Sequence, residues 1–61
     1  MEPILSKLRK MIQEATGKKV DQEKTRRILG ILDIQGTIDP ILANNDLITL
    51  RAAVTEWEED Q

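Results

Sequence analysis

Apolar side chains recur three or four positions apart in several segments of this chain, and nowhere do they alternate with polar ones. Such spacing places the apolar residues on one face of a helix, whereas a half-buried strand needs strict alternation. The first segment shows the pattern over its whole length, at Ile4, Leu5, Leu8, Met11, Ile12 and Ala15. The sequence therefore predicts an all-α fold.

Residues with capping preferences set the expected boundaries of the first two helices. Pro3 suits a first helical turn and Gly17 is a natural stop, which predicts a helix over about 3–16. Asp21 is a good N-cap because its carboxylate accepts backbone N–H groups. A second helix is expected over about 22–33, ending at the break formed by residues 34–37.

The remaining chain predicts one short helix and one long helix. Asp39 as N-cap and Pro40 at the first helical position begin a connecting helix over about 40–44. Asn45 or Asp46 then caps a last helix over about 46–59. Residues 1–61 are thus expected to form a single small domain, a bundle of three main helices with a short connecting helix.

Six aliphatic residues are expected to form the core of this bundle: Leu8, Ile12, Ile28, Leu32, Leu50 and Val54. Trp57 continues the seam of Leu47, Leu50 and Val54 on the last helix, which favours its packing against the core. Its flanking glutamates leave a second interpretation open, in which Trp57 is an anchor at an interface.

The composition excludes most catalytic and metal chemistry. The chain has no Cys and no His, so disulfides, thiolate sites and imidazole ligands are ruled out, and no cofactor or metal is expected. Its hydroxyl groups have no base to activate them, and we expect no enzyme activity. With 61 residues the domain buries little surface, and oligomerisation is the remaining means of stabilising it.

No apolar run exceeds three residues, far short of a membrane span. No secretory signal opens the sequence, and the lack of cysteine suits a reducing compartment, so a cytoplasmic location is expected. The basic amphipathic segment 3–16 is compatible with a membrane-surface helix, but a helix facing a core is the commoner outcome, and no membrane partner is expected.

Charge is distributed unevenly along the chain. Through Ile34 there are eight basic and five acidic residues, and after it Arg51 alone stands against six acidic residues. The first part is therefore +3 and the second −5. This asymmetry is compatible with head-to-tail association or an acidic partner, but a solvated surface that ends in an acidic fringe is the commoner explanation.

Residues 25–35, TRRILGILDIQ, resemble the start of a helix-turn-helix motif. DNA binding by such a motif requires a following helix that reaches base edges and cations that contact phosphates. The following segment has no Lys or Arg, so nucleic acid is not expected as a partner. A DNA-binding regulator that contacts phosphates through Arg26, Arg27, Lys18 and Lys19 remains the alternative function.

Residues 33–39, DIQGTID, resemble the middle of an EF-hand calcium loop. With Gly36 at the loop glycine, the first and last ligand positions fall on Ile31 and Leu42. Calcium needs carboxylate oxygens at both ends of the loop. We therefore expect this segment to be a simple connector, in which a turn at Gly36 joins two helices, and we expect no calcium site.

Two surfaces are candidates for binding. Gly30 is expected on the exposed side of its helix, where it is either simply tolerated or leaves room for a partner beside Arg26, Arg27 and Leu29. A second stripe on the last helix, Ile48, Ala52 and Thr55, favours self-association, with a homodimer as first expectation. The expected function is a non-enzymatic protein–protein interaction module of regulatory, adaptor or assembly type.

Overall fold

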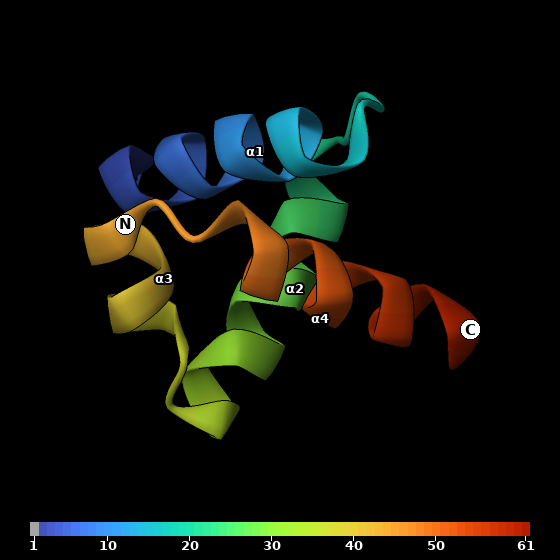
Figure 1. Ribbon diagram of the computed structural model, residues 1–61. Helices are drawn as coiled ribbons and strands as arrows, with labels where there is room; N and C mark the ends of the chain where they lie inside the picture. The colour runs from blue at the N-terminus through green and yellow to red at the C-terminus, as the bar shows by residue number, and fades with distance from the viewer. Residues whose placement is uncertain (1) are drawn as a thin grey trace.

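The computed structural model describes residues 2–61, and within them the chain is helical with short connections (Figure 1). The helices are α1 (Glu2–Thr16), α2 (Gln22–Gln35), α3 (Ile38–Asn44) and α4 (Leu47–Glu59). Helix α1 packs against both α2 and α4, and the short α3 closes the bundle between the end of α2 and the start of α4. The predicted all-α class and its three long helices and one short helix are confirmed.

Side chains of α1 hold the connector between α1 and α2. Gly17 ends α1 with a φ of 72°, a left-handed conformation that glycine adopts without strain. Gln13 accepts a hydrogen bond from the Val20 amide at 3.1 Å, and Arg9 Nε donates to the Val20 carbonyl at 2.8 Å. The Val20 side chain is buried. Val20 therefore fixes the connector to α1.

Helix α2 begins as predicted and ends later than predicted. The Asp21 carboxylate accepts a hydrogen bond of 2.7 Å from the Lys24 amide, which confirms the N-cap. The expected end at residue 33 is wrong, because Ile34 and Gln35 continue the helix to Gly36. The stop requires the left-handed φ of 73° that Gly36 supplies, and the Thr37 amide then bonds the Leu32 carbonyl at 3.0 Å.

Helix α3 begins two residues before the predicted start. It starts at Ile38 with Thr37 as N-cap, so Asp39 is not the N-cap and Pro40 is not the first helical residue. Pro40 is tolerated as the third residue because the first amides of a helix have no intrahelical acceptor. Asn45 ends the helix in the left-handed conformation, and the Asp46 carboxylate caps α4 by accepting from the Thr49 amide at 3.0 Å.

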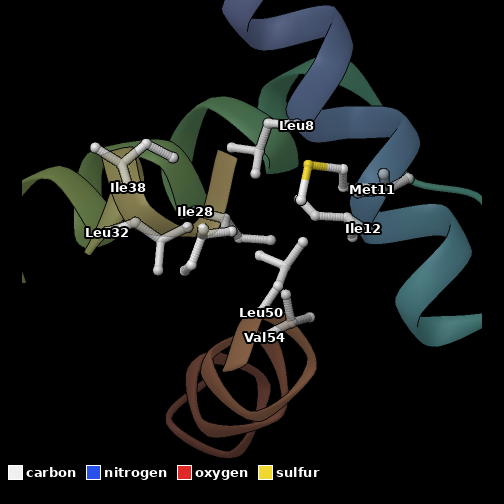
Figure 2. Close-up of a cluster of buried hydrophobic side chains, with 10 residues drawn as sticks. Leu8, Met11, Ile12, Ile28, Leu32, Ile38, Leu50 and Val54 are labelled. Atoms are coloured by element: carbon white, nitrogen blue, oxygen red, sulfur yellow. The ribbon is translucent and has the colours of Figure 1, made fainter. Parts of the chain in front are cut away.

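The core lies where α1, α2 and α4 meet, with α3 contributing from one side (Figure 2). All six predicted core residues are buried, together with Leu5, Met11, Val20, Ile38 and Ile41. Thr25 is a buried polar residue, and its hydroxyl donates to the Asp21 carbonyl at 2.8 Å. Trp57 is half-buried and packs on the edge of this core. Ile4 departs from expectation, because 43% of it is exposed at the first turn of α1.

Candidate functional site

Three of the four residues of the predicted partner surface lie on the side of α2 that faces away from the core, and the fourth, Leu29, lies at its edge. Arg26, Arg27 and Gly30 are exposed, while Leu29 is half-buried against the core cluster. Arg27 forms an ion pair of 3.2 Å with Glu23 one turn earlier, but both side chains are largely solvated. Such an exposed pair contributes little to stability and leaves the guanidinium available to another carboxylate.

Gly30 is helical, and its surroundings are empty. A Cβ built on Gly30 would meet no atom within 4 Å beyond its own helical neighbourhood. No packing contact inside the chain therefore requires a glycine at this position, although a helix-interior glycine lowers stability by about 1 kcal/mol relative to alanine.

Ile34 extends this surface by one further turn. Its side chain is 88% exposed on the last turn of α2, four residues after Gly30. Sequence reasoning missed it because the helix was expected to end before it. The signal was Gly36, which as the obligatory left-handed stop would have placed Ile34 inside the helix.

A groove opens beside Leu29, between the start of α1, the middle of α2 and α3. Its volume is about 180 Å³, and it is lined by Ile4, Leu29, Asp33, Ile38, Asp39 and Leu42. Lys7 reaches across from α1 and donates a hydrogen bond of 3.1 Å to the Leu42 carbonyl. The sequence did not reveal this groove because three separate helices contribute its walls. Leu29 belongs both to the groove and to the predicted partner surface.

The predicted self-association stripe lies on the side of α4 that faces away from Leu50 and Val54. Ile48 is 86% exposed, and Ala52 and Thr55 are exposed on the same side of the helix. The stripe therefore has no partner within residues 2–61. It is narrow, with one large aliphatic side chain followed by two small ones.

The cations proposed for phosphate contacts divide between two places. Lys18 and Lys19 line a cleft between the connector and α4, whereas Arg26 and Arg27 lie on α2 outside that cleft. Lys24 and Arg51, which sequence reasoning did not single out, line the same cleft. The four cations expected to act together are thus not brought to one site.

Two carboxylates have perturbed acidity. The pKa of Asp46 is lowered, mainly by the hydrogen bond that the Thr49 hydroxyl donates to it and then by the Thr49 amide. The pKa of Glu58 is lowered, mainly by the hydrogen bond from Lys24 and then by the charges of Lys24 and Lys18. Asp46 performs a capping role, while Glu58 faces the cationic cleft.

Among the side chains of residues 3–61, no three acidic groups come together in an arrangement that could hold a metal ion. None of the helices in this described part is long and apolar enough to cross a bilayer. Comparison with protein-family models, curated proteins and solved structures finds no match to this chain.

Proposed function

We propose that this chain is a non-enzymatic protein–protein interaction module of regulatory, adaptor or assembly type. It binds a partner protein on the outer side of α2 and associates with itself through α4. The supporting observation is that the predicted partner surface, formed by Arg26, Arg27 and Gly30, continues through Leu29 into the apolar groove between α1, α2 and α3. The sequence contains no cysteine, which suits a reducing compartment, so the proposal includes a cytoplasmic location.

The surface has the composition of a docking site. Ile4 and Ile34 are large aliphatic side chains that are 43% and 88% exposed, and complete burial of such a side chain contributes about 1.5–3 kcal/mol. Arg26 supplies a planar cation that can hold a carboxylate through two hydrogen bonds. The missing side chain at Gly30 allows another backbone to approach between these groups. A partner helix with aliphatic residues and a carboxylate beside them fits this pattern.

Affinity capture from the native host, followed by mass spectrometry, tests the proposal. The bait is compared with Arg26→Gln and with Ile34→Glu, two exposed substitutions that leave the core intact. We expect each variant to lose a partner that the wild-type chain retains. Lys10→Gln on α1 is the control matched to Arg26→Gln, because it removes the same charge from an exposed site elsewhere.

Circular dichroism of each bait establishes that the variants are folded. Capture of the same partners by wild type, Arg26→Gln and Ile34→Glu in equal amounts would show that α2 is not the docking surface. If Lys10→Gln also lost the captured partners, the interaction would depend on the net charge of the chain and not on the α2 surface.

A further inference from the structure

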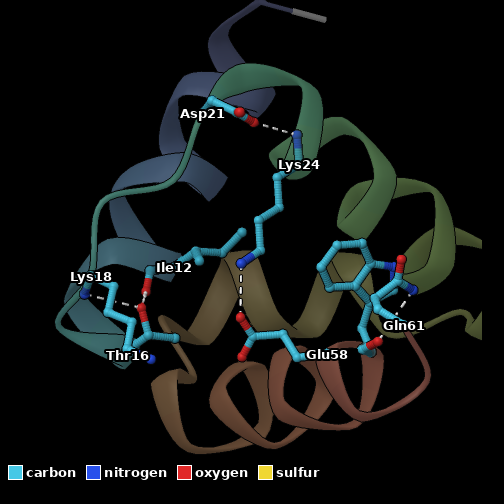
Figure 3. A network of polar contacts seen from close by, with 8 residues as sticks. Ile12, Thr16, Lys18, Asp21, Lys24, Glu58 and Gln61 are labelled. Carbon is cyan, nitrogen blue, oxygen red and sulfur yellow. Dashed lines mark hydrogen bonds and ion pairs between the residues drawn. The ribbon is translucent and has the colours of Figure 1, made fainter.

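A cleft with an excess of positive charge lies between the end of α1, the connector and α4. Its volume is about 180 Å³. Buried aliphatic side chains of Ile12, Val20 and Val54 line it. Lys18, Lys19, Lys24 and Arg51 supply the cations at this cleft, against Glu58 as its carboxylate. Figure 3 shows Lys24 and Glu58 meeting across the space between α2 and α4.

The carboxylate of Glu58 is an example of an anionic group that is stabilised by the cations of the cleft. Its Oε2 lies 2.8 Å from Lys24 Nζ, and the charge of Lys18 acts on it as well, since both cations lower its pKa. Among the side chains that the structure describes, those of residues 3–61, the remaining cations Lys18, Lys19 and Arg51 form no ion pair. One carboxylate therefore leaves most of the positive charge of the cleft uncompensated.

The backbone that carries two of these cations is held in place before any ligand arrives. Gly17 fixes the turn with its left-handed φ of 72°, and both polar groups of the Val20 peptide are bonded to side chains of α1. Lys18 and Lys19 lie between these two fixed points. A site whose backbone is already ordered loses less entropy on binding.

We propose that this cleft is a binding site for a small phosphoryl oxyanion, in which the carboxylate of Glu58 is an internal competitor. A phosphoryl group that carries close to two negative charges compensates several cations better than a carboxylate with one negative charge does. Lysine ammonium groups bind phosphate as point charges, and the guanidinium of Arg51 can bind two of its oxygens. The volume is below the roughly 300 Å³ at which pockets for drug-sized ligands begin, so a phosphoryl group with a small organic part is the size that fits.

The first experiment is a titration of the folded chain with inorganic phosphate and with pyrophosphate at low salt, followed by ¹⁵N-resolved NMR. We expect saturable shifts centred on the amides of residues 17–20 and of the second half of α4. Arg51→Gln should weaken binding about tenfold, the equivalent of one charge-assisted hydrogen bond. Absence of saturation with both anions would overturn the proposal.

The internal competitor gives a second and sharper test. Glu58→Gln should strengthen phosphate binding several-fold, because it removes the anion that already bonds Lys24. Glu59→Gln changes the net charge equally at an exposed residue that does not line the cleft, and it should leave the affinity nearly unchanged. An equal gain for both variants would reduce the effect to net charge and refute a localised site.

Arg26→Gln is the matched control for Arg51→Gln, since it removes a guanidinium outside the cleft. Equal weakening by the two substitutions would also refute the site. Glycerol 3-phosphate, compared with inorganic phosphate, identifies the source of the phosphoryl group. Tighter binding of the ester would assign the apolar part of the cleft to an organic moiety, and tighter binding of the free anion would assign the site to phosphate itself.

Discussion

Lys24 on α2 donates a hydrogen bond of 2.8 Å from Nζ to Oε2 of Glu58 on α4, although 34 positions separate the two residues in the sequence. The same ammonium lies 5.4 Å from the centroid of the Trp57 ring, within the range of a cation–π interaction. Lys24 therefore joins the first turn of α2 to the last turns of α4, where the hydrophobic core has already ended. This contact positions the C-terminal part of α4 beside the cationic cleft.

The Lys24–Glu58 pair predicts how stability depends on pH. The pKa of Glu58 lies below its ordinary value of 4.5 in the folded chain, so the folded state binds this proton less readily than the unfolded state. The stabilisation is complete above the ordinary pKa and is lost as pH falls through the lowered folded value. Urea denaturation should show Glu58→Gln to be slightly less stable than wild type at pH 7, with no difference at about pH 2. Glu59→Gln is the control, and an unchanged gap at low pH would contradict the assignment.

Truncation of the core should lower the melting temperature markedly. Leu8 and Leu50 have no exposed surface, and replacing a buried leucine by alanine lowers the free energy of unfolding by about 2–5 kcal/mol. That loss is large beside the roughly 5–15 kcal/mol of total stability typical of a domain. Thermal denaturation of Leu8→Ala and Leu50→Ala measures it. Ile34→Ala is the control, because that side chain is 88% exposed. Unchanged melting curves for both core variants would be incompatible with the packing described.

Gly30 within α2 and Gly36 directly after it should respond in opposite directions to replacement by alanine. Gly30 is helical with open space around it, so Gly30→Ala should raise the free energy of unfolding by up to about 1 kcal/mol. Gly36 has a φ of 73°, so Gly36→Ala should lower the free energy by about 1–2 kcal/mol. Denaturant titrations of the two variants measure these effects. If a partner backbone approaches Gly30, the more stable Gly30→Ala variant should also bind that partner more weakly; equal binding would make Gly30 merely tolerated.

Self-association through α4 predicts a dimer that one substitution abolishes. Ile48 is 86% exposed on the stripe that Ala52 and Thr55 continue, and small residues allow two helices to approach closely. Light scattering behind size exclusion should give a dimer mass for wild type and a monomer mass for Ile48→Glu. Ile34→Glu, which adds the same charge on α2, should stay dimeric. A monomer mass for wild type at high micromolar concentration would end this proposal.

Duplex DNA should bind weakly at most. The helix that follows the Gly36 turn, α3, contains Asp39 and no Lys or Arg, so it has no cation for a phosphate. A fluorescence titration at about 50 mM salt is the most favourable condition, because phosphate contacts strengthen as salt falls. Submicromolar and sequence-selective binding under that condition would favour the DNA-binding alternative instead.

Helix positions and the central core were predictable because they depend on local rules. The spacing of Leu8 and Ile12, like that of Leu50 and Val54, assigns each pair to one face of its own helix, without reference to any other helix. The caps at Asp21 and Asp46 are similarly local, since a capping side chain bonds an amide only a few residues away. The end of α2 was placed too early because the apolar stripe, rather than the left-handed Gly36, was taken as the boundary. The start of α3 was placed too late because Asp39 and Pro40 were taken as its N-cap and first residue.

The sequence by itself determined the helices, their buried faces and the exposure of Ile48, because each follows from the periodicity of one helix. Only the tertiary structure decided which residues of different helices meet. The groove around Leu29 needs walls from three helices, and the cationic cleft joins Lys18 to Arg51 across the bundle. The crossing of α1 over α2 and α4 sets these neighbours, and that crossing depends on how whole helix surfaces pack rather than on the pattern within any one segment.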